Sequence, residues 1–303
     1  MKPRVVDSHT HRYPPEVFKD PKGWARARGE RHWVSLVAPC RDHPSLQGWA
    51  DRDRMLADMD AGGVDQAVLL GWYWEHQETC EWHNRWYAQW IREDPDRFAA
   101  FASVQPLAGE KALDAVKQAV DWGFCGIGEV LPAVQGFARD HPSWLRVLEF
   151  AVENHMCVTL HVTEPVGPSY PGKVATPFAD YEWLAQTFPE LKLILAHWGG
   201  LLPFYELNRT CQRTFRNVYY DTAASPLLYD KRVYRSVVEI VGAEKILFGS
   251  DYPLQLYPKE EAQFDFQRLL QEVRTAGLSE TQLSAILGGN AQRLLRLNID
   301  DSS

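Results

Sequence analysis

The chain has 303 residues, of which 45% are hydrophobic and 24% charged, a composition typical of a soluble globular protein. Its formal net charge of -8 argues against a broad basic surface for nucleic acid or anionic lipid. The 5 cysteines are dispersed without a Cys-x-x-Cys pair, which predicts reduced thiols in the cytoplasm, and we expect neither a secretory signal nor a membrane span.

The first predicted element is a strand over residues 5–11 that contains Asp7, His9 and His11. Alternate side chains of a strand share a face, so these three are expected to project together. Two imidazoles on one face favour a barrel strand whose C-terminal end opens into a metal site. The alternative is a surface strand with two solvated histidines. Asp7 is one step deeper, and we expect it to support a metal ligand rather than bind the metal.

Residues 12–50 are rich in Pro, Gly, Arg and His and show no sustained hydrophobic periodicity. We interpret them as a long insertion that is ordered by packing rather than by secondary structure of its own.

A regular alternation of short apolar runs and helical patterns follows. The other predicted strands are 66–71, 98–104, 126–130, 157–162, 191–197, 217–222 and 245–251. The predicted helices are 51–62, 82–92, 110–122, 143–154, 178–188, 202–209, 231–241, 260–275, 280–287 and 290–297. This pattern predicts an α/β fold, a (β/α)8 TIM barrel in one domain over 1–303, with the insertion after the first strand and extra C-terminal helices. The alternative, an open doubly wound sheet, predicts a glycine-rich phosphate loop that the sequence lacks.

Titratable residues stand at the C-terminal ends of several predicted strands, where a closed parallel barrel would bring them to one mouth. They are His9, His11, Glu129, His161, His197 and Asp251. A single histidine there is usually a hydrogen-bonded core residue, and a single carboxylate is usually a cap or turn residue. Their convergence instead predicts a catalytic divalent-metal site, most suited to zinc, with manganese, iron or cobalt as alternatives. Asp251 would act as general base and then acid on a metal-activated water.

Several motifs together resemble the amidohydrolase superfamily, in particular the amidohydrolase-related group that includes aminocarboxymuconate-semialdehyde decarboxylase. They are Asp7-x-His9-x-His11, Thr159-Leu160-His161, Leu195-Ala196-His197-Trp198-Gly199-Gly200, Leu247-Phe248-Gly249-Ser250-Asp251-Tyr252-Pro253 and Gly289-Asn290-Ala291-Gln292-Arg293-Leu294-Leu295. The resemblance implies that His9, His11, His161 and Asp251 bind metal. It makes His197 either a ligand of a second metal or the catalytic histidine.

Glu129 stands where many members of that superfamily place a carboxylated lysine between two metals. A glutamate could bridge two ions, bind one, or orient a ligand by hydrogen bonding. We favour a ligand, so the expected cofactor is one or two divalent ions per chain.

The main functional hypothesis is a metal-dependent hydrolase that cleaves an amide, lactone or ester of a small molecule. The alternative is a metal-dependent, non-oxidative decarboxylase or hydratase of a small aromatic or unsaturated carboxylic acid. A third hypothesis is a barrel that binds a ligand without catalysis. The expected partner is a small-molecule substrate, with neither nucleic acid nor membrane involved, and the resemblance favours a homodimer.

Residues outside the metal set carry weaker signals. Trp72-Tyr73-Trp74 follows the second strand, where it would form either an aromatic wall for the substrate or a packing surface for the insertion. His76 and His83 share a helix face and are expected to be an exposed pair. Arg12 could clamp a substrate carboxylate, although the direction of the chain after His11 is open.

Overall fold

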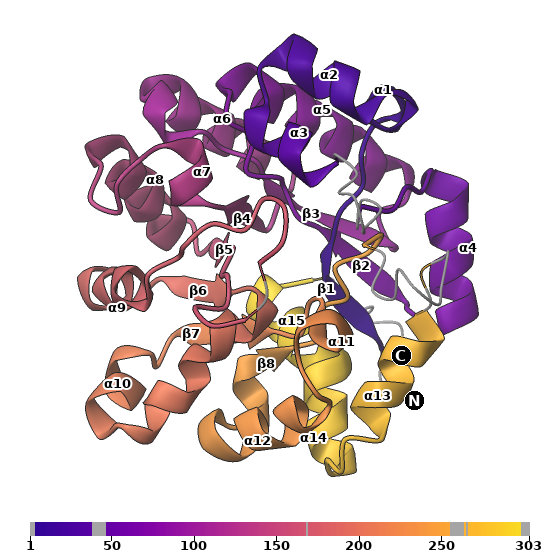
Figure 1. The fold of residues 1–303 in the computed structure, drawn as a ribbon, viewed down its shortest axis with the longest axis vertical. Coiled ribbons are helices and arrows are strands. Elements are labelled where there is room, and N and C mark those ends of the chain that lie inside the picture. The colour runs from indigo at the N-terminus through magenta and orange to yellow at the C-terminus, as the bar shows by residue number, and fades with distance from the viewer. Residues whose placement is uncertain (1–3, 38–46, 168, 255–263, 265, 298–303) are drawn as a thin grey trace.

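Eight parallel strands form a barrel in the computed structural model, which describes residues 4–37, 47–167, 169–254, 264 and 266–297. The strands are β1 (Val6–Thr10), β2 (Gln66–Leu69), β3 (Phe98–Ala102), β4 (Gly126–Val130), β5 (Cys157–Leu160), β6 (Lys192–Leu195), β7 (Val218–Asp221) and β8 (Ile246–Leu247). They are ordered as in the sequence, and helices surround them (Figure 1).

Backbone hydrogen bonds join β1 to the segment after β8 and close the barrel. Ser8 N donates to Phe248 O at 2.8 Å, Asp251 N donates to His9 O at 2.9 Å, and His11 N donates to Tyr252 O at 2.6 Å. The predicted (β/α)8 barrel is therefore confirmed, because an open doubly wound sheet would leave two unpaired edges.

The principal helices are α4 (Arg52–Gly62), α5 (Gln77–Glu93), α6 (Glu110–Asp121), α8 (Pro142–Glu153), α9 (Phe178–Thr187), α10 (Arg209–Thr214), α12 (Arg232–Val241) and α13 (Phe266–Arg274). Short elements lie between them: η1 (Pro106–Ala108), α7 (Pro132–Gln135), η2 (His197–Leu207), α11 (Ser225–Leu228) and η3 (Ala243–Lys245). Each long helix turns an apolar stripe to the sheet, as Ala112, Val116 and Ala119 do in α6. Among the described residues, no helix is both long and apolar enough to cross a membrane.

The C-terminal helices follow one another without a break as α14 (Glu280–Ser284), η4 (Ala285–Gly289) and α15 (Asn290–Leu295). The predicted separate pair, 280–287 and 290–297, is therefore one continuous helical run. Leu294 and Leu295 pack with Val6, Cys157 and other interior residues at the N-terminal ends of the strands. α15 thus closes that end of the barrel.

The prediction that the insertion lacks secondary structure is wrong. It forms three short helices, α1 (Pro15–Lys19), α2 (Pro21–Arg28) and α3 (Arg31–Leu36). Proline begins α1 and α2, and the Asp20 side chain accepts a hydrogen bond from Gly23 N at 3.0 Å at the start of α2. Helices this short show no hydrophobic periodicity in the sequence, although the proline and aspartate residues that mark where they begin are present. Residues 38–46 of the insertion lie outside the described residues.

The last strand is shorter than predicted, with ladder pairing only at Ile246 and Leu247 instead of over 245–251. Phe248 N donates instead to Ile286 O in η4 at 3.0 Å. Gly249 passes so close to β1 that a Cβ atom there would stand 2.7 Å from His9 Cβ. The predicted helix 260–275 is observed as α13, which begins at Phe266. Residues 260–263 and 265 of that prediction lie outside the described residues.

The predicted exposed pair of His76 and His83 is also wrong. α5 begins at Gln77, earlier than expected, and His76 is its exposed N-cap. His83 is fully buried because its helix face turns toward the aromatic residues of the insertion. Its Nδ1 accepts a hydrogen bond from Trp74 Nε1 at 3.0 Å, and its Nε2 lies 3.0 Å from Arg12 O.

Candidate metal centre

The six predicted residues meet at the C-terminal end of the barrel. Two groups have ligand atoms that all lie within 4.8 Å of one another: His9 with His11 and Asp251, and His9 with Glu129 and His197. His161 belongs to neither group, but its Nδ1 lies 2.8 Å from Glu129 Oε1 and 3.3 Å from His197 Nε2. It therefore stands at the edge of the same cluster.

Three imidazoles turn Nε2 toward the cluster and contact an oxygen atom outside it through Nδ1. The Nδ1 atoms of His9, His11 and His197 lie 2.8 Å from Asp221 Oδ2, 3.3 Å from Leu70 O and 3.2 Å from Ala223 O, respectively. An ionised carboxylate and a carbonyl oxygen can only accept, so we assign the proton of each neutral ring to Nδ1. Each Nε2 then offers a lone pair to the centre, as a metal ligand requires.

The spacing of these atoms fits a shared cation. His9 Nε2 and His11 Nε2 lie 3.2 Å apart, His11 Nε2 lies 3.4 Å from Asp251 Oδ1, and His197 Nε2 lies 3.5 Å from Glu129 Oε1. Ligand atoms about 2.1 Å from one ion are separated by about 3.0–3.4 Å in octahedral or tetrahedral geometry. Facing lone pairs and carboxylate oxygens repel one another unless a cation or proton lies between them.

The electrostatics of the cluster favour added positive charge. Burial lowers the pKa of His9, but the charges of Asp221, Glu129 and Asp251 outweigh burial and raise it to about 10. Burial likewise lowers the pKa of His197, and Glu129 and Asp251 raise it to about 9. Because metal ligation requires neutral imidazoles, a divalent cation bound here would displace these protons.

The pKa values of the two carboxylates shift in the opposite direction from those of the histidines. Burial raises the pKa of Asp251, but the hydrogen bond with His11 and the charges of His9 and His197 bring it down to about 2. Burial also raises the pKa of Glu129, and the charge and hydrogen bond of His161 hold it well below its usual value. Both side chains are therefore anionic acceptors. Glu129 contacts His161, His197 and His11 from the middle of the cluster.

Asp221, at the end of β7, is a functional residue that sequence reasoning missed. Its Oδ2 holds His9, and its Oδ1 accepts hydrogen bonds from His197 N at 2.9 Å and Ala223 N at 3.0 Å. It thus orients two histidines from different strands. The available signal was its position, because it ends a predicted strand just as the six chosen residues do.

Asp7 supports the centre through the backbone. Its Oδ1 accepts from His9 N and from Ser250 N, each at 3.0 Å, and thereby ties β1 to the segment that carries Asp251. The β1–β2 register shifts between Asp7 and Thr10, so the regular alternation assumed from the sequence is interrupted there. Asp7 is in neither group of ligand atoms.

A left-handed turn sets the direction of His197. Residues His197 to Leu201 all have positive φ, between 55° and 73°. Gly199 and Gly200 adopt this conformation without steric cost, and a Cβ atom on Gly199 would stand 2.9 Å from the Tyr220 ring. Trp198 is held by the hydrogen bond from its Nε1 to Ser225 Oγ at 2.6 Å. The His-Trp-Gly-Gly motif therefore carries the local geometry of the centre.

The aromatic triplet after β2 lies between the metal centre and the insertion. The Trp72 ring lies 5.0 Å from that of His11, and the Tyr73 ring lies 5.5 Å from that of His161. The Trp74 ring instead packs 5.1 Å from Trp24 in the insertion. Trp72 and Tyr73 also contact the insertion, at 5.0 Å from the Trp33 ring and 5.6 Å from the His32 ring, so all three residues pack against it and the first two also lie beside the centre.

Arg12 is not brought to the centre. Its guanidinium lies 3.9 Å from the ring centroid of Trp90 in α5, between the barrel and its helices. The interpretation of Arg12 as a clamp for a substrate carboxylate therefore receives no support from its position.

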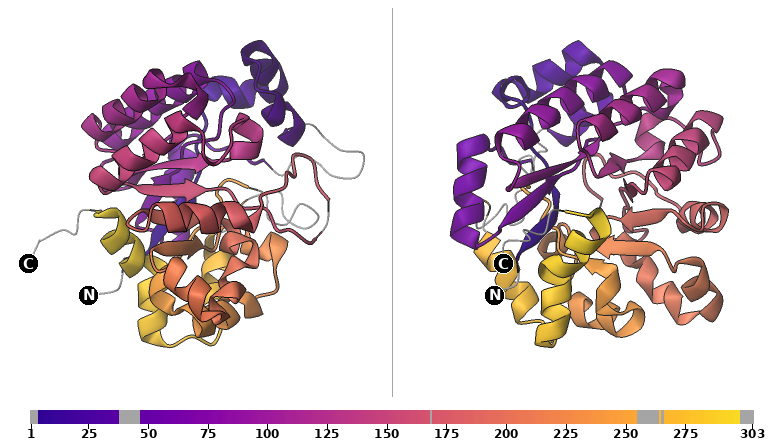
Figure 2. Two further views of the ribbon diagram at one scale, coloured as in Figure 1. Left: turned by 90° about the vertical axis from the view of Figure 1, so that its left-hand side faces the viewer. Right: turned by 180° about the vertical axis from the view of Figure 1, so that it is seen from behind.

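At the rim of the mouth, the insertion contacts the loop that follows β5. This loop crosses in front of the barrel (Figure 1) and projects on the same side as α1–α3 (Figure 2). His32 Nε2 lies 2.9 Å from Gly172 O. The loop is braced by Lys173 Nζ, which donates to Glu164 Oε1 at 2.6 Å, and by Thr163 N, which donates to Thr176 Oγ1 at 2.9 Å.

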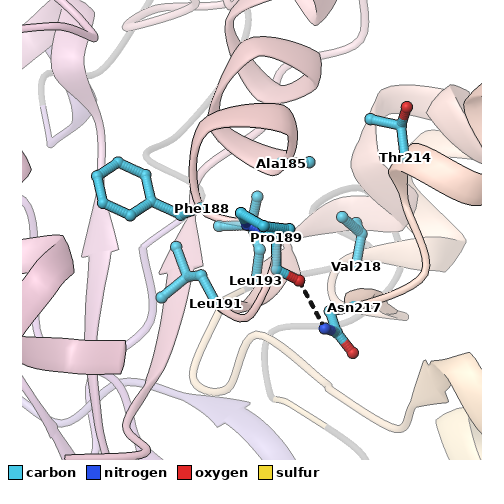
Figure 3. A pocket seen from close by; sticks show the side chains of 8 residues that line it. All are labelled: Ala185, Phe188, Pro189, Leu191, Leu193, Thr214, Asn217 and Val218. Atoms are coloured by element: carbon cyan, nitrogen blue, oxygen red, sulfur yellow. Dashed lines mark hydrogen bonds between the residues drawn. The ribbon is translucent and has the colours of Figure 1, made fainter. Parts of the chain in front are cut away.

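A recess between α9 and α10 lies at the other end of the strands (Figure 3). It is lined by Ala185, Phe188, Pro189, Leu191, Leu193, Thr214, Asn217 and Val218. These side chains include no titratable group, so the recess lacks the means for acid–base or metal chemistry.

Comparison with known proteins identifies the family. The family described as Amidohydrolase matches residues 6–297. The chain belongs to the amidohydrolase family. This confirms the resemblance seen in the motifs.

Three proteins to which this chain is similar are named as decarboxylases. A 2-amino-3-carboxymuconate-6-semialdehyde decarboxylase from Dictyostelium discoideum is 24% identical, with 97% of this chain and 92% of the relative covered. The structure of 5-carboxyvanillate decarboxylase from Sphingomonas paucimobilis has a TM-score of 0.75 at 20% identity, covering 98% of this chain and 100% of that one. A dihydroxybenzoic acid decarboxylase from Polaromonas with bound manganese and the inhibitor 2-nitroresorcinol has a TM-score of 0.65 at 18% identity, covering 98% of each chain.

These relatives contradict the main functional prediction, a hydrolase of an amide, lactone or ester, and favour its decarboxylase alternative. The error has a physical reason: the histidine and carboxylate motifs mark a metal site, and the same site supports hydrolysis or decarboxylation. The cluster of ligand atoms fits a divalent metal, and nothing in it favours zinc specifically. The cytoplasmic location, the homodimer and the single domain over 1–303 stay predictions.

Proposed function

We propose that this protein catalyses the metal-dependent, non-oxidative decarboxylation of a small aromatic or unsaturated carboxylic acid. The observation that carries the proposal is the match over 97% of the chain to a relative named as a decarboxylase. The buried cluster at the barrel mouth supports it, since it supplies both cation ligands and groups that can carry a proton.

The reaction replaces a carboxylate on carbon with hydrogen. A proton is added to the carbon that bears the carboxylate, the carbon–carbon bond breaks, its electron pair returns to the carbon skeleton, and CO2 leaves. One proton is consumed in each turnover. A bound divalent cation supplies an anchor for substrate oxygen and stabilises negative charge on it.

We assign the holding of the cation to His9, His11, Glu129, His161 and Asp251. Substrate would approach from the side of His161 and Asp251, whose side chains are 18% and 13% exposed, whereas that of Glu129 is 2% exposed. Manganese and zinc are the two ions to test first, because the donor atoms suit both.

We further assign the proton transfer to Asp251 and the stabilisation of charge on substrate oxygen to His197. Asp251 is the more exposed of the two central carboxylates, so it can exchange protons with solvent. A carboxylate at this position can accept a proton and release it again, as the proton-consuming step requires. His197 Nδ1 lies 4.0 Å from Asp251 Oδ2, so the two side chains share one side of the centre.

The test is CO2 release by protein stripped of metal and reloaded with Mn²⁺ or Zn²⁺. The substrates would be 2,6-dihydroxybenzoate, 5-carboxyvanillate and freshly generated 2-amino-3-carboxymuconate semialdehyde. We expect CO2 from at least one, dependent on metal. Metal-loaded protein that releases none from these acids, but hydrolyses a lactone or amide, would overturn the proposal.

A further inference from the structure

Tyr73 occupies the open side of the centre. Its ring stacks on Trp72 at 4.3 Å between centroids and lies 5.5 Å from the ring of His161 and 5.6 Å from that of His32. His161 has the most exposed side chain of the candidate ligands, so a substrate that contacts it comes close to the Tyr73 ring. Trp72 and Tyr73 together offer flat apolar surfaces suited to an aromatic ring.

The hydroxyl of Tyr73 is available to a ligand. The residue is 4% exposed, and its hydroxyl makes no hydrogen bond to any other described residue. Burial raises its pKa well above the usual value, and the charges of Glu129 and Asp251 raise it further. A phenolic hydroxyl can donate a hydrogen bond to a ligand oxygen. Unlike that of Tyr13, this hydroxyl is not among the sealed, unpartnered polar atoms, so it is open to an oxygen acceptor on a ligand.

The insertion holds the backbone around Tyr73 in place. Glu75 N donates to Glu30 Oε2 at 2.7 Å, and His32 N donates in return to Glu75 Oε2 at 2.8 Å. Gln135 Nε2 also donates to Trp74 O at 3.1 Å. These bonds fix the backbone directly after Tyr73, which restricts its ring before a ligand binds.

We propose that Tyr73 is a specificity-determining residue whose hydroxyl donates a hydrogen bond to an oxygen substituent on the ring of the bound aromatic acid. The inference rests on the proposed function and deepens it, because it favours aromatic acids that carry an oxygen substituent on the ring. The hydrogen bonds that join Glu75 to Glu30 and His32 would give the insertion a role in substrate selection.

The test measures binding to the metal-loaded full chain by calorimetry, with 2-nitroresorcinol, 2-nitrophenol and nitrobenzene as probes that lose ring hydroxyls stepwise. Tyr73→Phe retains the ring and removes only the hydroxyl. We expect it to weaken binding of 2-nitroresorcinol about tenfold and to leave nitrobenzene unchanged, as for the loss of one neutral hydrogen bond.

Tyr13→Phe is the matched control. Tyr13 belongs to the same aromatic cluster, but its hydroxyl is sealed from solvent and has no partner, so we expect unchanged binding of all three probes. Equal binding of 2-nitroresorcinol by Tyr73→Phe and the wild type would overturn the inference, as would equal losses in both variants. If the metal-loaded wild type binds none of the probes and decarboxylates no ring-hydroxylated acid, the proposed aromatic substrate itself fails.

Discussion

The two ends of the barrel interior are filled by opposite kinds of side chain. At the N-terminal ends of the strands, Val6, Cys157 and Ile194 pack against Leu294 and Leu295 of α15. At the C-terminal ends, the same strands lead to buried imidazoles and carboxylates. Apolar burial stabilises the fold at one end, whereas desolvated charge at the other opposes folding unless it is paired or bound to a cation. Stability and chemistry should therefore respond separately to substitutions at the two ends.

The largest expected effect is on catalysis at the C-terminal end. Asp251→Asn keeps the shape of the side chain but cannot accept and release the proton, so we expect the rate of CO2 release to fall by about 10²–10⁴-fold. The melting temperature should change little. Wild-type turnover by this variant, measured with the metal content matched, would show that another group carries the proton.

The converse substitution is at the N-terminal end. Leu294→Ala removes a buried side chain that is 5% exposed, and we expect the free energy of unfolding to fall by about 2–5 kcal/mol. Denaturant titration measures the loss. The folded fraction should keep the metal content and turnover of the wild type, and a matched loss of metal would mean that the two ends are coupled.

Much of this division follows from the sequence, because strand periodicity and polar strand ends are local patterns. His9, His11, Glu129, His161, His197 and Asp251 were all placed at the mouth by that reasoning. Features that depend on tertiary partners were not accessible in the same way. β8 is shortened because Phe248 bonds to Ile286, far along the chain.

Other errors came from signals that were present but read differently. Asp221 ends β7 and holds His9, yet a single aspartate after two tyrosines carries no motif. The insertion helices are too short for periodicity, and the contacts of Trp72, Tyr73 and Trp74 with the insertion depend on how it folds back. The type of reaction was inaccessible because the ligand set does not encode it.

Asp221 tests how far support extends beyond the direct ligands. Asp221→Asn retains hydrogen bonding but removes the negative charge that holds His9 Nδ1, so we expect metal affinity to weaken about 10–100-fold. Competition with a chromogenic chelator measures this affinity. An unchanged affinity would place Asp221 outside the centre's function.

His83 is a buried titratable residue away from the cluster, and it should affect stability without affecting chemistry. Burial lowers its pKa to about 3, and the hydrogen bond to Arg12 O only partly offsets this. The unfolded chain then takes up a proton near pH 6.5 that the folded chain refuses, so stability is full at pH 7 and is lost as the pH falls toward 3.

The expected slope is about 1.4 kcal/mol per pH unit at most between pH 6 and 4, measured by urea unfolding. His83→Gln should flatten this slope and leave the metal content unchanged. The same slope in the variant and the wild type would show that the acid sensitivity arises elsewhere.

The most direct test of the account is the divalent metal content of the purified protein by elemental analysis, compared with the His9→Ala variant. His9 belongs to both groups of candidate ligands, so its loss should affect every ion held at the mouth. The account predicts at least about one equivalent per chain in the wild type and a large loss in the folded variant. A wild-type protein that binds no divalent metal when it is supplied, or a variant that retains all of it, would contradict the account.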